Sequence, residues 1–268
     1  KVSSGAKLTI GNDNAFYAKS KLEVVDGASL ELNADVTTSE FFIDGVMQSI
    51  GEYSSASNPD LISGTGKIVI GRPEIFVFHR GSNGNWDNPE HYTPALLPLA
   101  GETVICEEEM ETTSTVFEAD IILQGAGLLR LRGDPSKNHT STGKVIMESG
   151  TSFKYNTSGS GMYINAPIVV NGDVTMYMES GNASGSTMTL AGPVSGYSKV
   201  TVLNNGKGTP NDGTVLLTND NSEFKGTWDL TVNSERYPGT SDYISWIEGN
   251  SENAFGKGNI VAGLNNRV

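Results

Sequence analysis

The fold class is most evident in residues 161–232, which read GMYINAPIVVNGDVTMYMESGNASGSTMTLAGPVSGYSKVTVLNNGKGTPNDGTVLLTNDNSEFKGTWDLTV. Short runs of alternating apolar and polar residues, such as VTMYM and TVLLT, are separated every few residues by Gly, Asn, Asp or Ser. The runs have the length of strands and the β-branched and aromatic residues that strands favour, and the separators are turn formers. Because no window keeps a 3.6-residue period for two turns, the stretch predicts many short strands and no helix.

Three features favour a solenoid over a sandwich or a barrel. The runs are short and numerous, a turn that contains Gly recurs before them (DGASLEL, GAGLLRL, NGDVTMY), and Tyr155, Tyr177 and Tyr197 are spaced 22 and 20 residues apart. Units of roughly 20 residues that stack only on their neighbours have such a period. We therefore predict an all-β fold, a right-handed parallel β-helix (β-solenoid) with irregular coils and a long inserted loop, as a single module over residues 1–268.

Several phrases carry a resemblance to a known family: INAPIVVNGDV, MTLAGPVSG, GTVLLTNDNSEFKGTWDLTV and ENAFGKGNIV. They resemble the autotransporter-associated β-strand repeats of secreted bacterial β-helices. The N-terminal FFIDGVMQSIGEYSSASNPDLISGTGKIVIG is similar to a phrase of those proteins in which a short hairpin precedes the last strand of a unit. The overall style is similar to that of secreted proteins of gut Bacteroidota, and within that group to the non-catalytic β-helical modules attached to xylan-degrading enzymes (carbohydrate-binding module family 89). This resemblance implies xylan as the ligand and a catalytic glycoside hydrolase domain in the same parent chain.

Charge and cysteine content narrow the classes of partner. The 268 residues carry a net charge of −13, which argues against nucleic acid and anionic membrane because both demand a basic surface. The charge also disfavours polyanionic substrates, unless calcium or a local basic groove intervenes, whereas a neutral polysaccharide meets no such objection. The one cysteine, Cys106, excludes an intramolecular disulfide, and its place in the alternating run ETVIC predicts a buried structural thiol.

The ends of the sequence predict a segment of a larger protein. The chain starts and stops within its strand pattern, no signal peptide precedes Lys1, and no run approaches the roughly 18 apolar residues of a membrane helix. Because bare solenoid ends expose unpaired strand edges, we expect further domains and the signal peptide to lie outside this sequence. The expected location is extracellular or on the cell surface.

Residues 73–103 interrupt the strand rhythm with GSNGNWDNPEHYTPALLPLAGE, the longest stretch without a strand pattern. Long loops in tight folds often carry function, and this one contains Trp86, His91 and Tyr92. Two interpretations of the aromatic residues stay open: they pin the loop against the solenoid, or they contact a ligand.

Other candidate residues follow from the alternation within the strands. Val174, Met176 and Met178 share one face, so Tyr177 faces outward, and Tyr163 does so for the same reason. Trp228 shares its face with Leu230 and is predicted to lie in the core. A second aromatic-rich stretch at 233–248 contains Tyr243 and Trp246, and the latter has no clear facing. The acidic run Glu107, Glu108, Glu109 and Glu111 predicts a solvated face.

Three functions fit this sequence. A binding module would stack sugar rings on exposed aromatics; its candidate contact residues are Trp86, Tyr92, Tyr163, Tyr177, Tyr243 and Trp246. A polysaccharide lyase or hydrolase would need a cation site, an Arg/Lys cluster or a facing carboxylate pair, and no local motif selects one. A structural spacer or adhesin segment would have scattered aromatics only. We predict the binding module, with no catalytic residue, metal ligand or cofactor, while a structural calcium in an Asp/Asn loop stays open.

Overall fold

The computed structural model describes residues 1–13, 15, 20–71, 74–81, 84–113, 116–131, 143–155, 162–178, 187–204, 213–231 and 245–262. These residues form an all-β structure in which most strands pair in parallel, so the predicted fold class is confirmed at that level. The chain divides into two compact units, Lys1–Pro73 and Glu74–Val268. The sequence predicted one continuous module instead. The difference arises because each unit has its own buried core, and among the described strands none of unit 1 pairs with one of unit 2.

Unit 1 contains three small sheets around a core that includes Leu30, Phe41 and Ile68. The sheets are β1 (Lys7–Ile10), β3 (Ser29–Leu32) and β8 (Ile62–Gly64); β2 (Lys21–Val24), β5 (Glu40–Ile43) and β6 (Val46–Met47); and β4 (Val36–Thr38), β9 (Lys67–Ile70) and β7 (Gly51–Ser54). β5 and β6 form an antiparallel hairpin. Its turn residues Asp44 and Gly45 have φ angles of 52° and 77°, as the tight hairpin turn requires.

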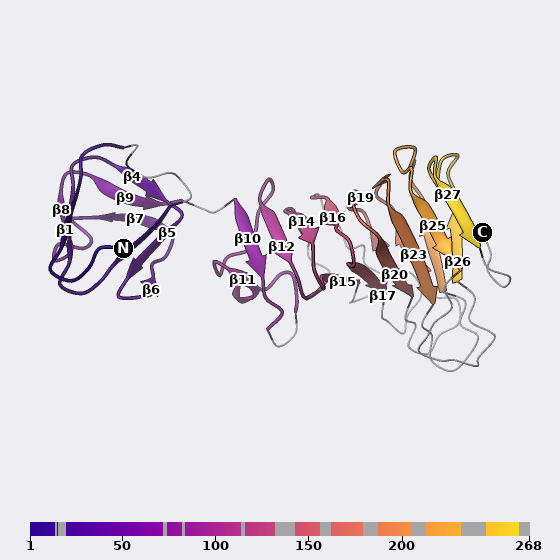
Figure 1. Ribbon diagram of the computed structural model, residues 1–268, viewed down its shortest axis with the longest axis horizontal. Coiled ribbons are helices and arrows are strands. Elements are labelled where there is room, and N and C mark those ends of the chain that lie inside the picture. Colours follow the sequence, from indigo (N-terminus) through magenta and orange to yellow (C-terminus); the bar gives the residue numbers. More distant parts are fainter. Residues whose placement is uncertain are drawn as a thin grey trace. The chain divides into compact units, whose positions relative to one another are not determined.

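The described part of unit 2 contains three sheets with more strands, and Figure 1 shows successive strands lying side by side along this unit. The first sheet contains, in spatial order, β11 (Tyr92–Thr93), β10 (Ile75–Phe78), β12 (Thr103–Cys106), β14 (Asp120–Leu123), β16 (Val145–Met147), β19 (Ile168–Val170) and β22 (Val194–Gly196). The second contains β13 (Glu109–Glu111), β15 (Leu128–Leu131), β17 (Ser152–Tyr155), β20 (Val174–Met178), β23 (Lys199–Asn204), β25 (Thr227–Leu230) and β27 (Asn259–Ala262). The third contains β18 (Met162–Ile164), β21 (Thr187–Leu190), β24 (Gly213–Leu217) and β26 (Ser245–Gly249).

Side chains alternate between the core and the surface along these strands. In the first sheet the inward side chains of Phe76, Val104, Ile121, Val145 and Ile168 stand in register on five successive strands and are buried. Trp228 on β25 is buried against Phe224, with ring centroids 4.8 Å apart, which confirms the prediction that it lies in the core.

The distance along the chain between paired residues varies widely. It is 17 residues from Ile105 to Ile122 and 28 from Val77 to Ile105. Tyr177 pairs with Lys154 and Leu203, and neither Tyr155 nor Tyr197 stands opposite it. The tyrosine spacing used in the sequence argument therefore does not mark the strand register.

Close approach of neighbouring strands explains part of the high glycine content. A Cβ atom at Gly143 would lie 2.0 Å from the carbonyl oxygen of Ala119, and one at Gly192 would lie 2.0 Å from that of Ala166. Only a residue without a side chain fits where one chain segment passes so close to the next.

Candidate binding surface

Trp86 and Tyr92 are buried in the loop between β10 and β12. The Trp86 indole stacks on Phe117 with ring centroids 5.2 Å apart, and its Nε1 donates to Thr113 Oγ1 over 2.9 Å. The Tyr92 hydroxyl donates to the carbonyl oxygen of Trp86. The two residues are 0% and 2% exposed, so neither ring offers a face to a sugar. Of the two interpretations, the loop pin agrees with this geometry, and Trp86 and Tyr92 leave the set of candidate contacts.

His91 holds the same loop through both ring nitrogens. Nδ1 lies 2.9 Å from the carbonyl oxygen of Asn85, and Nε2 lies 3.2 Å from Nδ2 of Asn88. Because a carbonyl oxygen can only accept, we assign the proton to Nδ1, and Nε2 then accepts from the Asn88 amide. Asn88 also begins the short 3₁₀ turn η1 (Pro89–His91), where its Oδ1 accepts from the backbone N–H of Glu90. The buried His91 is therefore part of the loop's internal framework.

Tyr163 and Tyr177 both face outward, as their strands predict. Tyr163 on β18 is 42% exposed, and Tyr177 on β20 is partly exposed while its neighbour Met176 is buried. They belong to different sheets, the third and the second, so the structure does not bring them together on one sheet. Of the two remaining candidates, Tyr243 lies outside the described residues. The backbone of Trp246 stands opposite Thr214 in the third sheet, and its side chain is outside the described part.

Tyr177 belongs to a row of side chains that crosses the outer face of the second sheet. Strand register places Glu111, Arg130, Lys154, Tyr177 and Leu203 on five successive strands. Neighbouring strands lie about 4.8 Å apart, so the row holds acidic, basic and aromatic groups in a straight line. Arg130 and Lys154, which the sequence argument did not single out, become neighbours of Tyr177 only through this register.

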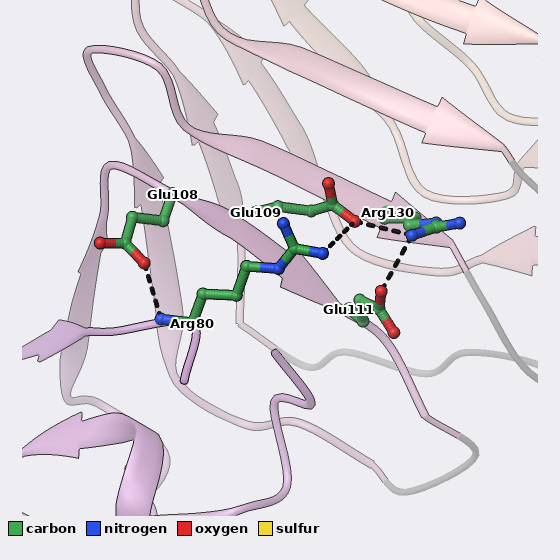
Figure 2. A network of polar contacts seen from close by, with 5 residues as sticks. All are labelled: Arg80, Glu108, Glu109, Glu111 and Arg130. Atoms are coloured by element: carbon green, nitrogen blue, oxygen red, sulfur yellow. Dashed lines mark hydrogen bonds and ion pairs between the residues drawn. The ribbon is translucent and has the colours of Figure 1, made fainter. Parts of the chain in front are cut away.

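One end of this row is a network of ion pairs (Figure 2). Arg130 Nη1 lies 2.8 Å from Glu109 Oε1 and 3.0 Å from Glu111 Oε1, and Arg80 Nη2 lies 3.6 Å from the same oxygen of Glu109. The backbone N–H of Arg80 donates to Glu108 Oε2 over 2.8 Å. The network ties the loop after β10 to the second sheet.

The acidic run is therefore only partly a solvated face. Glu107 and Glu108 are exposed, but the side chain of Glu111 is 2% exposed. A backbone bridge places the loop around Asn85 alongside β13, so Glu111 is flanked by this loop on one side and by Arg130 of β15 on the other. Glu109 and Glu111 form ion pairs with the same arginine, Arg130. The two catalytic carboxyls of a glycosidase must flank the sugar bond that is cleaved. Glu111 is too deeply buried for a sugar to reach it, so this pair does not have that arrangement.

Cys106 is fully buried at the end of β12, as predicted for a structural thiol. Burial raises the pKa of the Cys106 thiol to about 12. Its Sγ donates to the carbonyl oxygen of Glu108 over 3.1 Å, a contact that only the protonated thiol can make. A thiol with this pKa is almost wholly protonated at neutral pH and is a poor nucleophile.

Tyr197 was missed as a candidate. Its side chain is 75% exposed, which is the largest exposed fraction among the large apolar and aromatic residues that the structure describes. The side chain follows Gly196 in the turn between β22 and β23, and Lys225 Nζ lies 5.3 Å from its ring centroid. Its place after a glycine, flanked by serines, was the available signal, because a tyrosine in a tight surface turn has little to pack against.

Within the described residues there is no group of three or more His, Cys, Asp or Glu side chains arranged to hold a metal ion. Nor does the described part contain a helix of the length and apolar character that crossing a membrane requires.

Comparisons with protein-family models, curated proteins and solved structures find no match.

Proposed function

We propose that this chain is a non-catalytic carbohydrate-binding module that recognises a plant cell-wall polysaccharide, with xylan as the first candidate from the family resemblance. Its parent protein is secreted, is extracellular or attached to the cell surface, and carries a catalytic glycoside hydrolase domain. Tyr177 and Tyr163 are the contact residues that remain in the described part of the chain.

We further propose that unit 2 is a right-handed parallel β-helix. The order of its strands supports this: between β16 and β24 the chain visits the first, second and third sheets in turn three times, through β16, β17 and β18, then β19, β20 and β21, and then β22, β23 and β24. Each new strand pairs in parallel with the previous strand of the same sheet, as β19 does with β16, β20 with β17 and β21 with β18. Such a scaffold presents flat, preformed faces, which lowers the ordering cost of binding an extended polymer.

The observation that carries the binding proposal is the position of Tyr177. Its partly exposed side chain stands one strand away from Lys154 and two strands away from Arg130 on a parallel sheet. An aromatic ring packs against the apolar face of a pyranose, and neighbouring polar groups bind the hydroxyls. The net charge of −13 favours a neutral polymer over an acidic one.

Affinity gel electrophoresis tests the proposal with arabinoxylan, glucuronoxylan, β-glucan, mannan, pectin and alginate, with assays of reducing sugar and of absorbance at 235 nm on the same samples. We expect xylans to retard the protein without release of product. Tyr177→Ala should weaken the apparent affinity by about tenfold, since losing roughly 50 Å² of apolar contact costs about 1.3 kcal/mol.

The matched control is Phe42→Ala, which removes a partly exposed aromatic from unit 1, where Lys21 Nζ lies 3.9 Å from the ring centroid. Retardation should not change in this variant. Release of product would overturn the non-catalytic assignment and favour a lyase or hydrolase. If no polysaccharide retards the protein and no product is released, the binding module is wrong and the spacer or adhesin function replaces it.

A further inference from the structure

The outer face of the first sheet carries an aliphatic row that no part of the proposed site uses. Strand register places Val77, Ile105, Ile122, Ile146 and Val169 side by side on five successive strands. Val77 is 39% exposed and the other four are partly exposed, while the residues on either side of them point into the core. At about 4.8 Å per strand the row is about 19 Å long and one side chain wide.

A second row of outward side chains runs beside it, where the strands end. Glu107, Gln124, Glu148 and Asn171 each follow directly on the inward residues Cys106, Leu123, Met147 and Val170, which are themselves in register. Gln124 Nε2 donates to Glu107 Oε1 over 2.7 Å, and Asn171 Nδ2 donates to Glu148 Oε1 over 3.0 Å. Two carboxylate–amide pairs thus alternate along the edge of the aliphatic row, two residues, or about 7 Å, farther along each strand.

The polar row ends at the exposed ring of Tyr197. Val170 pairs with Gly196, so Tyr197 follows Gly196 as Asn171 follows Val170. The first sheet therefore presents a line of four hydrogen-bonding side chains, an aromatic ring at its end, and an aliphatic row alongside. An ion pair lies near the ring. Lys225 Nζ is 5.3 Å from the Tyr197 ring centroid, and Glu223 Oε2 lies 3.8 Å from Lys225 Nζ.

We propose that this face is a second binding site, for a single extended chain of a neutral polysaccharide. The inference rests on the function proposed above. Sugar rings would lie with their apolar faces on the aliphatic row, their hydroxyls would bond to the carboxylate–amide pairs, and Tyr197 would stack against one further ring. The two carboxylates, Glu107 and Glu148, repel uronate polymers.

The dimensions favour a polymer over a protein partner. A stable protein interface buries about 800 Å² on each partner and has a broad apolar centre. The row is one side chain wide on β12, β14 and β16, where Thr103, Asp120 and Lys144 lie along its other side, and only on β10 does the exposed Ile75 widen it. It therefore fits a narrow amphipathic ligand better than a second protein surface. A carboxylate–amide edge is also suited to hydroxyl groups, which both donate and accept.

Two variants test the site by affinity gel electrophoresis with neutral arabinoxylan and β-glucan as probes. The first is the triple variant Ile105→Thr, Ile122→Thr, Ile146→Thr, which keeps β-branched residues in the strands. The second is Tyr197→Ala. Each should weaken retardation by at least tenfold, and Val69→Thr, a partly exposed aliphatic position on β9 of unit 1, should leave it unchanged. Far-UV circular dichroism and the thermal midpoint verify that each variant folds.

The outcomes separate this inference from the proposed function. If xylan retards the wild type and neither variant changes this, the second site is wrong and the binding function stands. If no polysaccharide retards the wild type, both are overturned. Retardation by polygalacturonate that the triple variant abolishes would refute the neutral polymer. Sedimentation showing a dimer of the wild type that the triple variant dissociates would assign the face to a second copy of the chain.

Discussion

Arg130 offers the sharpest test of how the ion-pair network stabilises unit 2. Its guanidinium lies between Glu109 and the buried Glu111, and its own side chain is 19% exposed. Arg130→Met keeps most of the side-chain volume and removes the charge that compensates Glu111. Breaking a buried ion pair by removal of one partner costs 3–5 kcal/mol, because the other charge stays in a poorly solvated position.

We expect the lower end of this range, about 3 kcal/mol. Arg130 keeps some contact with water, and its buried Nε has no hydrogen-bond partner among the described residues. Unit 2 spans Glu74–Val268, and for a unit of that size 1 kcal/mol shifts the midpoint of thermal unfolding by 2–4 °C. The expected decrease is therefore about 6–12 °C.

Tryptophan fluorescence is the appropriate probe, since all three tryptophans, Trp86, Trp228 and Trp246, belong to unit 2. Urea unfolding of the wild type, Arg130→Met, Glu111→Gln and the double variant gives a coupling energy, for which we expect about 2 kcal/mol. Lys144→Met is the control: it breaks the exposed pair with Asp120, 3.4 Å apart, and should cost less than about 1 kcal/mol. A coupling below about 0.5 kcal/mol would refute the argument that Arg130 compensates a buried charge.

Three more predictions concern stability. Gly192→Ala should strongly destabilise unit 2 or prevent its folding, whereas Gly11→Ala, which meets no atom within 4 Å, should change stability by less than about 0.5 kcal/mol in urea unfolding. Asn221→Ala should cost about 2–3 kcal/mol by the same measurement, since this buried amide accepts from one backbone segment and donates to another. Raising the pH from 8 to 11 should weaken unit 2. Burial raises the pKa of the Cys106 thiol to about 12, so its contribution is complete below the unfolded pKa of about 9 and is lost progressively as the pH rises toward 12. Burial also raises the pKa of Tyr92, whose contribution begins to fall only above its unfolded pKa of about 10. Urea midpoints between pH 8 and 11 should fall for the wild type and fall less for Cys106→Ala, while equal slopes would contradict this.

The facing of single side chains was predictable because it depends on local alternation. Met176 and Trp228 point inward and Tyr177 outward, as a period of two residues requires. Strand partners were not predictable from spacing, since the loops between paired strands vary in length. Tyr177 therefore has Lys154 as its neighbour, and not another tyrosine as the regular spacing suggested.

The local sequence pattern also could not predict which side chains are buried by segments distant in the sequence. Glu111 alternates with Met110 and should face water, yet it is buried where the loop around Asn85 lies alongside its strand. For Trp86 the sequence left two interpretations open, because the same glycine-rich and asparagine-rich loop could present the ring outward or fold it inward. The stacking partner that decides between them, Phe117, lies 31 residues farther along the chain.

These two effects also explain why the proposed binding surfaces have no linear motif. Each row takes one residue from each strand, so side chains about 4.8 Å apart in space are separated by 17 to 28 residues in sequence, as from Ile105 to Ile122 and from Val77 to Ile105. A ligand that bridges such a row must itself be extended, because each row continues from strand to strand along the sheet. Lengthening an oligosaccharide probe should therefore raise the affinity until it spans the aliphatic row, and a ligand of one or two sugar units should bind weakly. If affinity were already maximal for a disaccharide, the binding site would be a local pocket and neither row could be its basis.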